Sequence, residues 1–291
     1  MELGTGRLDN GIFHVVYSKD GQGTESLEAG TYRITASRGI EYGIDRIDLE
    51  LKAGQDQSIE FLVPHQVDTT GWISGDFHLH AEPSFDSGLP LEKRVITNIV
   101  EGVELLSSSD HDAITDYEPT LKALGMDRYA TSQIGSEVSP LEVGHFLGFP
   151  LEFDATNIPT HGAIDWVCKT HHQIFSEMDA LGAGGVGNNV IAVAHPRDGF
   201  LGYFDQFGLN PWTLNQDGGG LEANNPLFRS VSCDFDAMEL LNAKRFELLR
   251  TPTVSEINDT NRCIKELNNA GSHAEIRNAC NWLREPATCN A

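Results

Sequence analysis

The segment Gly75–His80 constrains this chain most, because its residue pattern predicts a strand that ends in a pair of histidines. Successive side chains of a strand point to opposite faces, so His78 and His80 share one face while Phe77 and Leu79 share the other. The apolar face predicts packing against helices. The histidine face can direct both imidazoles at one metal ion, so the same strand is expected to serve a core and a metal site.

Alternating strand-like and helix-like runs begin with this segment. Such alternation is typical of a parallel sheet, either open or closed into a barrel, in which catalytic groups lie at the carboxyl ends of the strands. The fold class predicted from the pattern is therefore α/β. The expected strands are 73–80, 103–109, 133–138, 144–149, 190–194 and 235–241, and the expected helices include 91–101 and 164–181.

The first 70 residues have a different texture. Short alternating or β-branched runs are separated by turns that contain Gly, Asp or Asn, which predicts a small antiparallel β domain. We expect a β domain at residues 1–70, with a linker at its end, and a second domain at residues 71–291. The strands expected in the first domain are 14–17, 31–37, 47–51 and 59–63.

Metal-ligating residue types follow the predicted strands in chain order. A lone histidine at a strand end is more often a hydrogen-bonded residue than a ligand, and aspartate is common in turns. Their repeated position at or just past strand ends favours one shared site instead, and imidazole with carboxylate is the donor set of hydrolytic metal centres. The set comprises His78, His80, Asp86, Asp110, His111, Glu137, His145 and His195.

The motifs that carry these residues resemble those of the PHP-domain phosphoesterases, the polymerase and histidinol phosphatase superfamily. The resemblance is closer to its carbaryl-hydrolase-like branch, which carries a small β domain in front. It extends from residue 25 to about residue 245. The motifs lie at residues 75–80, 84–90, 109–112, 135–137, 144–146 and 194–197, with 31–33 and 38–42 in the leading domain.

The resemblance implies a distorted (β/α)7 barrel with a multinuclear metal centre. The centre of such a barrel holds two or three divalent metal ions, which are zinc, manganese or iron. The ligands implied for the three ions are His78 and His80 for the first, His145 and His195 for the second with Glu137 as the bridge, and Asp86 and His111 for the third.

The resemblance also implies roles for residues beside the ligands. Asp110 is expected to orient a metal-bound histidine, as carboxylates commonly do. Arg197 is a candidate either for neutralising an anionic substrate oxygen or for a structural salt bridge. A metal-activated hydroxide is then expected to attack a phosphoester, or a carbamate or carboxyl ester. No G-x-S-x-G segment in the sequence points to a serine nucleophile instead.

One family motif has no counterpart in this sequence. The family's metal set ends with Asp-x-His on the last strand, and no such motif occurs after residue 242. The later histidine, His273, has Gly271 where the aspartate is expected. We therefore expect a barrel that lacks its last strand, either because the chain is a truncated fragment or because it is a divergent member. Both alternatives predict weak metal binding and slow turnover.

Two other functional classes compete with this interpretation. An amidohydrolase-type barrel also begins with His-x-His, but that class usually needs a bridging lysine, and no lysine ends a predicted strand. A degenerate, non-catalytic PHP module that acts as a binding protein is the other alternative.

Composition limits the partners. Asp and Glu number 43 against 20 Lys and Arg, a net charge of −23 that disfavours nucleic acid as a partner. The resemblance, in turn, implies a small ester or phosphoester as the substrate. No apolar run predicts a membrane span, and residues 1–10 do not resemble a signal peptide. The compartment stays open, with an extracytoplasmic location among the alternatives, and so does the oligomeric state.

The chain has five cysteines, and this odd number argues against a complete disulfide framework. A bridge between Cys280 and Cys289 would fit an oxidising compartment.

Overall fold

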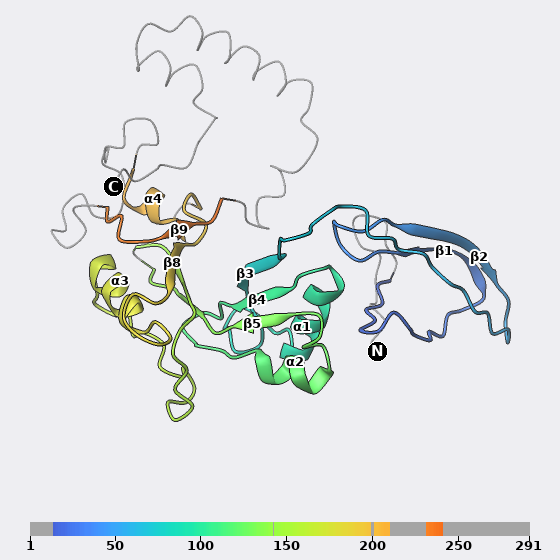
Figure 1. Cartoon of the computed structure of the whole chain (residues 1–291), viewed down its shortest axis with the longest axis horizontal. Helices are drawn as coiled ribbons and strands as arrows, with labels where there is room; N and C mark the ends of the chain where they lie inside the picture. Colours follow the sequence, from blue (N-terminus) through green and yellow to red (C-terminus); the bar gives the residue numbers. More distant parts are fainter. Residues whose placement is uncertain (1–13, 142, 199–200, 210–230, 241–291) are drawn as a thin grey trace, which may run out of the picture. The chain divides into compact units, whose positions relative to one another are not determined.

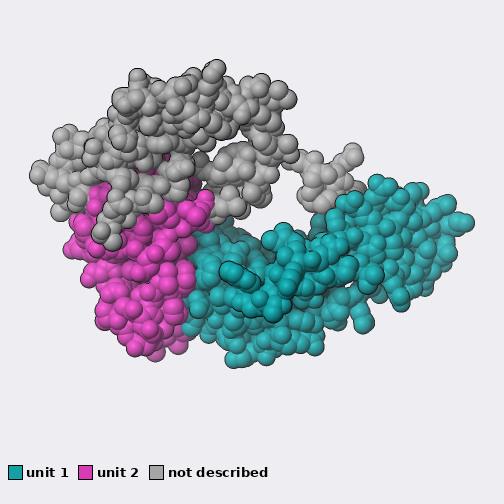
Figure 2. Space-filling view, turned by 45° about the horizontal axis from the view of Figure 1, so that its top comes forward, with its two compact units in different colours: residues 1–135 teal, residues 136–291 magenta. Residues whose placement is uncertain are grey.

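The computed structural model describes residues 14–141, 143–198, 201–209 and 231–240. The chain divides into two compact units, residues 1–135 and residues 136–291, which are coloured separately in Figure 2. Each unit is described by itself below. The domain boundary predicted at residue 70 falls inside the first unit, so the division into 1–70 and 71–291 stays a prediction.

A two-stranded antiparallel ladder opens the first unit (Figure 1). Strands β1 (Gly30–Ala36) and β2 (Asp45–Leu51) pair in a continuous register. Half-buried and exposed residues alternate along both strands, which is the pattern of a sheet covered on one face. Across the ladder, Arg33 makes two hydrogen bonds of 2.8 and 2.9 Å to Asp48, and this pairing holds the pKa of Asp48 below its usual value.

The predicted strands at 14–17 and 59–63 are wrong, because neither segment joins a ladder. The second segment shows the physical reason. The amide of Leu62 donates to the side chain of Asp45 at 2.9 Å, so a carboxylate takes the place of a neighbouring strand's carbonyl. A side-chain acceptor can hold an extended segment without making it part of a sheet.

The remainder of the first unit is a three-stranded parallel sheet with helices. Its strand order is β3 (Gly75–Leu79), β4 (Leu105–Ser108) and β5 (Thr131–Gln133), and all pairs are parallel. Helices α1 (Leu91–Val100) and α2 (Glu118–Leu124) lie on the two crossovers, as parallel pairing requires. A shared apolar core, which includes Leu79, Val95, Leu106 and Leu121, confirms the strand–helix alternation predicted for this part of the chain.

The second unit contains a four-stranded mixed sheet. Its order is β6 (Ser136–Val138), β7 (Phe146–Phe149), β8 (Val190–Val193) and β9 (Ala237–Met238). Pairs β6–β7 and β7–β8 are antiparallel, and only β8–β9 is parallel, so the parallel arrangement expected from sequence is wrong here. The connection 139–145 explains the first pair, because a parallel crossover needs a dozen or more residues.

Helix α3 (His171–Ala180) covers the sheet of the second unit and starts later than the predicted span 164–181. Cys168 has a φ of +60°, which breaks the helical path, and Thr170 then caps the new N-terminus with Gln173 in a reciprocal capping box. Within α3, Ile174 and Met178 are buried against the core, whereas Val167, from the part of the predicted span that is not helical, is 60% exposed. A short helix, α4 (Tyr203–Gln206), adds Tyr203 and Phe204 to the same core.

The described residues therefore mix helices and strands in three sheets, none of which closes into a barrel. This mixture of helices and strands agrees with the α/β class, but the described sheets do not show a (β/α)7 barrel. The expectations about a last strand, an Asp-x-His motif, His273 and a Cys280–Cys289 bridge lie outside the described residues. Of the cysteines that are described, Cys168 is an exposed free thiol and Cys233 is disulfide-bonded.

Candidate metal centre

The first unit brings three of the predicted ligands together. We call His80, Asp86 and His111 the first cluster, and their ligand atoms all lie within 4.8 Å of one another. Asp86 Oδ2 lies 3.5 Å from His111 Nε2, and Asp86 Oδ1 lies 3.9 Å from His80 Nδ1. The two imidazole rings stack with their centroids 4.6 Å apart.

The parallel sheet explains why these residues meet. His80 follows β3 and His111 follows β4, and these neighbouring parallel strands end at the same edge of the sheet. Asp86 lies on the connection from β3 to α1. His78 points the same way along β3, with its ring centroid 5.0 Å from that of His80.

The opposite face of β3 follows the prediction only in part. Leu79 is buried in the core, whereas Phe77 is 41% exposed although it was expected to pack against helices. In the described part of the sheet, β3 pairs only with β4, so fewer neighbouring side chains are available to cover Phe77 than on a central strand.

The sequence analysis did not identify two residues beside the first cluster, a serine and a phenylalanine. Ser84 is buried, and its Oγ contacts groups of all three cluster residues at 2.7–3.2 Å. Phe85 stacks on the His111 ring at 4.6 Å between centroids, yet 78% of its surface is exposed. Both residues lie in the turn that carries Asp86. Serine and aromatic residues are too common in turns for this pattern to signal a role.

Asp110 ties the chain after β4 to the chain after β3. One carboxylate oxygen accepts from the amide of Ala81 at 2.6 Å, and the other accepts from the hydroxyl of Tyr117 at 3.2 Å. Burial raises the pKa of Asp110, while the hydrogen bonds that it accepts act in the opposite direction. Asp110 is thus placed to hold the backbone beside His80, which fits the orienting role expected for it.

A second brace reaches His80 from helix α1. The Nε of Arg94 donates to the carbonyl oxygen of His80 at 2.6 Å. A charge-assisted hydrogen bond of this length is among the stronger ones in proteins. The sequence analysis did not identify Arg94 or Tyr117. Arg94 contacts the backbone of His80 and Tyr117 contacts Asp110, so neither contacts the ring of a predicted ligand.

The second unit assembles the other predicted ligands. Glu137, His145 and His195, here called the second cluster, are all buried. Glu137 Oε1 lies 3.0 Å from His145 Nδ1 and 3.2 Å from His195 Nε2, and the two rings meet edge to face at 5.0 Å. Neighbouring strands position them, since Glu137 is on β6, His145 precedes β7 and His195 follows β8.

Backbone strain occurs at His195, a predicted ligand in the second cluster. His195 has a φ of +27°, which is uncommon for a residue with a Cβ atom. Its amide donates to the carboxylate of Glu239, just past β9, at 2.7 Å. In the first unit, Asp112 has a φ of +53° directly after His111. Residues held in such conformations concentrate at functional sites, because the surrounding contacts must impose them.

Arg197 is engaged in an ion pair in this structure. Its Nη1 lies 3.0 Å from Asp205 Oδ1, and its guanidinium lies 5.4 Å from the ring centroid of Phe204. This geometry corresponds to the salt-bridge alternative predicted for Arg197, and a role toward substrate stays a prediction.

Both clusters fit a divalent metal ion. Two donor atoms on one tetrahedral zinc lie about 3.3–3.4 Å apart, because each bond is about 2.0–2.1 Å long. Asp86 and His111 have donor atoms 3.5 Å apart in the first cluster, and in the second Glu137 Oε1 lies 3.0 and 3.2 Å from the two imidazole nitrogens. A buried carboxylate such as Glu137 also requires compensating positive charge. The mixed imidazole and carboxylate donors suit zinc, manganese and iron alike.

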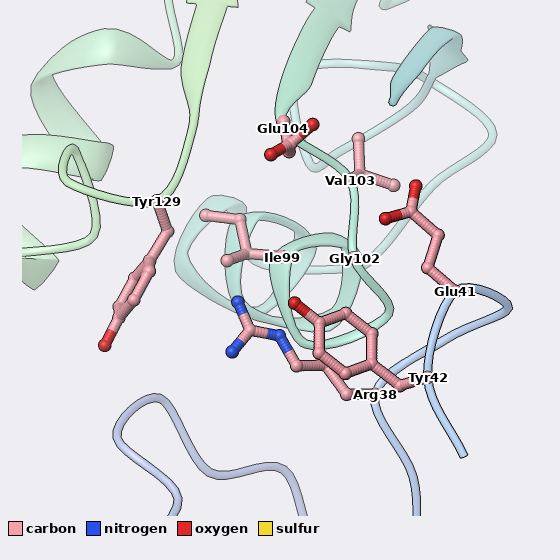
Figure 3. Close-up of a pocket in the computed structure, with 8 residues that line it drawn as sticks. All are labelled: Arg38, Glu41, Tyr42, Ile99, Gly102, Val103, Glu104 and Tyr129. Carbon is pink, nitrogen blue, oxygen red and sulfur yellow. The ribbon is translucent and has the colours of Figure 1, made fainter. Parts of the chain in front are cut away.

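A separate cavity in the first unit contains none of the predicted site residues (Figure 3). It has a volume of about 30 Å³, and Arg38, Tyr42, Glu104 and Tyr129 are among its lining residues. The guanidinium of Arg38 lies 4.9 Å from the ring centroid of Tyr42 and 5.7 Å from that of Tyr129. These contacts join the loop after β1 to the chain before β5, so the cavity reads as packing between elements.

Fold and site together define a mixed helix–strand protein with two histidine–carboxylate clusters that could hold metal ions. No protein-family model matches the chain, and no curated protein matches it. The resemblance to PHP-domain proteins therefore depends on the sequence motifs. None of the described helices is long and apolar enough to cross a membrane.

Proposed function

We propose that this protein is a metal-dependent hydrolase of the PHP type that cleaves a phosphoester, or a carbamate or carboxyl ester. The observation that carries the proposal is the grouping of six predicted ligands into two clusters at strand ends. A distorted (β/α)7 barrel with two or three divalent ions is part of the proposal.

Each cluster has a defined task in this proposal. His80, Asp86 and His111 hold metal in the first unit, with His78 beside them, and the ligands in the second unit are Glu137, His145 and His195. When bound, the ions supply an acidified water and polarise the ester oxygen. Donor atoms of Asp86 and His111 already lie 3.5 Å apart, and those of Glu137 and His145 lie 3.0 Å apart, so these pairs need little reorganisation to bind an ion.

The protein's own groups keep the ligands in place. Asp110 and Arg94 both hold the peptide group that joins His80 to Ala81, through hydrogen bonds of 2.6 Å. In the second unit, Glu239 holds the strained backbone of His195. Supporting bonds of this kind orient ligand rings and are typical of metal sites.

The amidohydrolase alternative receives no support from the described strands. That class usually needs a bridging lysine, and no lysine is among the two residues that follow any described strand of the two α/β sheets. Hydrolysis assays distinguish the proposed enzyme from the alternative of a non-catalytic binding module.

The test compares hydrolysis of bis(p-nitrophenyl) phosphate and p-nitrophenyl acetate by the full chain with added Mn²⁺ or Zn²⁺. We expect His111→Ala and Glu137→Gln each to lower kcat/KM by roughly 100-fold, since loss of a supporting partner alone costs about 10–100-fold. His172→Ala is the matched control, because His172 is half exposed and pairs with Asp234 at 3.5 Å outside both clusters. Equal rates for the native chain and both cluster variants contradict the proposal.

A further inference from the structure

Ser84 connects the three members of the first cluster through one oxygen atom. Its Oγ lies 2.7 Å from Asp86 Oδ1, 3.1 Å from the amide nitrogen of His111 and 3.2 Å from His80 Nδ1. Only 3% of the Ser84 surface is exposed, so solvent does not replace these partners.

The hydrogens can be assigned by counting. A serine hydroxyl has one proton to donate and two lone pairs to accept with. The amide of His111 can only donate, so it occupies one lone pair of the Ser84 oxygen. Asp86 is an ionised carboxylate at neutral pH and can only accept, so it receives the hydroxyl proton.

One lone pair of Ser84 then remains, and it faces His80 Nδ1. A hydrogen bond between these atoms forms only if Nδ1 carries a hydrogen. The carboxylate oxygen Asp86 Oδ1 lies 3.9 Å from the same nitrogen and favours a hydrogen there as well.

We infer that Ser84 fixes neutral His80 in the tautomer with hydrogen on Nδ1, so that Nε2 presents its lone pair to a metal ion. Ser84 is then a positioning residue that acts through His80. The role of this tautomer in metal binding rests on the proposed function. The tautomer itself is a property of the metal-free protein, so the two can fail separately.

The first measurement is a long-range ¹H–¹⁵N correlation spectrum of the metal-free full chain at pH 8, with ¹⁵N-labelled histidine. Histidine is largely neutral at this pH, because its usual pKa is about 6.5. His80→Asn identifies the signals of His80 by their loss. We expect a protonated Nδ1 and an unprotonated Nε2 in the native chain, and a protonated Nε2 would overturn the inference.

Variants separate the Ser84 hydroxyl from general effects on the loop. Ser84→Ala is expected to shift His80 toward the other tautomer. Ser87→Ala is the matched control, because Ser87 Oγ donates to the backbone oxygen of His80 at 3.3 Å and not to the ring. An unchanged tautomer in Ser84→Ala contradicts the inference. If that variant fails to fold, the spectrum of the native chain still decides.

Zinc affinity provides the second readout. In calorimetric titrations with Zn²⁺ alone, Ser84→Ala is expected to bind about 10–100-fold more weakly than the native chain, and Ser87→Ala equally well. Equal affinity in Ser84→Ala overturns the positioning role. A native chain that binds no zinc but shows hydrogen on Nδ1 contradicts the proposed function and leaves the tautomer assignment intact.

Discussion

Glu137 shows how a single buried carboxylate can organise a site. It is fully buried, and one of its oxygens serves both His145 and His195. Removing a carboxylate from water costs several kcal/mol unless hydrogen bonds or positive charge compensate. Paired imidazoles and a bound cation are two ways to compensate this charge, and the second would connect the stability of the second unit to metal binding.

Gly144, which precedes His145, occupies a position that admits no side chain. Its φ is +81°, and an added Cβ would lie 2.5 Å from the backbone nitrogen of Tyr203. We expect Gly144→Ala to lower the free energy of unfolding by more than about 2 kcal/mol, from backbone strain plus overpacking. Gly162→Ala is the control, with a φ of +93° but an ordinary contact of 3.5 Å, and is expected to show the strain alone. Urea unfolding measures both, and equal losses contradict the steric account.

Tyr203 makes the second unit sensitive to alkaline pH. Its hydroxyl donates to the carbonyl of Ser232 at 3.0 Å and accepts from the same residue's amide at 2.7 Å. Burial is the main cause that raises the pKa of Tyr203 far above its usual value. A raised folded-state pKa means that the stability is complete below about pH 10, where the unfolded tyrosine titrates, and declines as the pH rises further.

The corresponding variant is Tyr203→Phe. At pH 8 it should be less stable by roughly 1–3 kcal/mol, because the buried amide and carbonyl of Ser232 lose their partner. Between pH 9.5 and 11 its stability should decline less steeply than that of the native chain. Thermal melts across this range measure the slopes, and parallel curves would contradict the assignment.

Single residues were predictable from sequence when their own chemistry identified them. His80, Asp86 and His111 meet as their positions at strand ends predicted, and so do Glu137, His145 and His195. Ser84, Tyr117 and Glu239 were not predictable, because they act through hydrogen bonds to backbone or to a ligand's far side. Those bonds depend on tertiary contacts that leave no local pattern.

At the scale of elements, the N-terminus of α3 is held by side chains. The Thr170 hydroxyl accepts from the Gln173 amide at 3.3 Å, and the Gln173 side chain accepts from the Thr170 amide at 2.9 Å. Thr170→Ala should cost about 1 kcal/mol of stability, whereas Thr170→Ser, which keeps the oxygen, should cost much less. Urea unfolding followed by circular dichroism checks this, and equal losses in both variants would argue against capping.

Element types were more predictable than their pairing. The strand–helix alternation of the first unit gave a parallel sheet as expected, because α1 and α2 lie on its crossovers. In the second unit, the short connection after β6 reverses the chain and forces an antiparallel pair. Strand-like runs do not reveal their direction, so connection length carries more information about pairing than hydrophobic pattern does.

For the whole molecule, bound metal should add to stability by mass action. An ion present at 100 times its Kd stabilises the folded state by about 2.7 kcal/mol. At roughly 2–4 °C per kcal/mol for proteins of this size class, EDTA should lower the Tm of the zinc-loaded chain by roughly 5–10 °C. His172→Ala should respond equally, and a variant with both His111→Ala and Glu137→Gln should not respond. An unchanged Tm in the native chain is the contrary result.

At the scale of the whole chain, the sequence does not mark the boundary between the two compact units. This boundary falls between residues 135 and 136, in the short stretch from β5 to β6. No change in composition marks this point, whereas the texture change near residue 70 is conspicuous but lies inside one unit. Compactness depends on which distant segments pack together, and local composition does not report that.

The position of Phe85 is suited to a fluorescent probe of the first cluster. Because its ring lies against His111 and is largely exposed, a tryptophan at this position would keep the stack and remain open to solvent. The indole emission of Phe85→Trp, taken as a difference from the chain's four native tryptophans, would then be quenched by paramagnetic manganese or iron in the cluster and spared by zinc. An indole in place of the exposed ring beside His111 would thus report by its fluorescence which kind of ion binds to the first cluster.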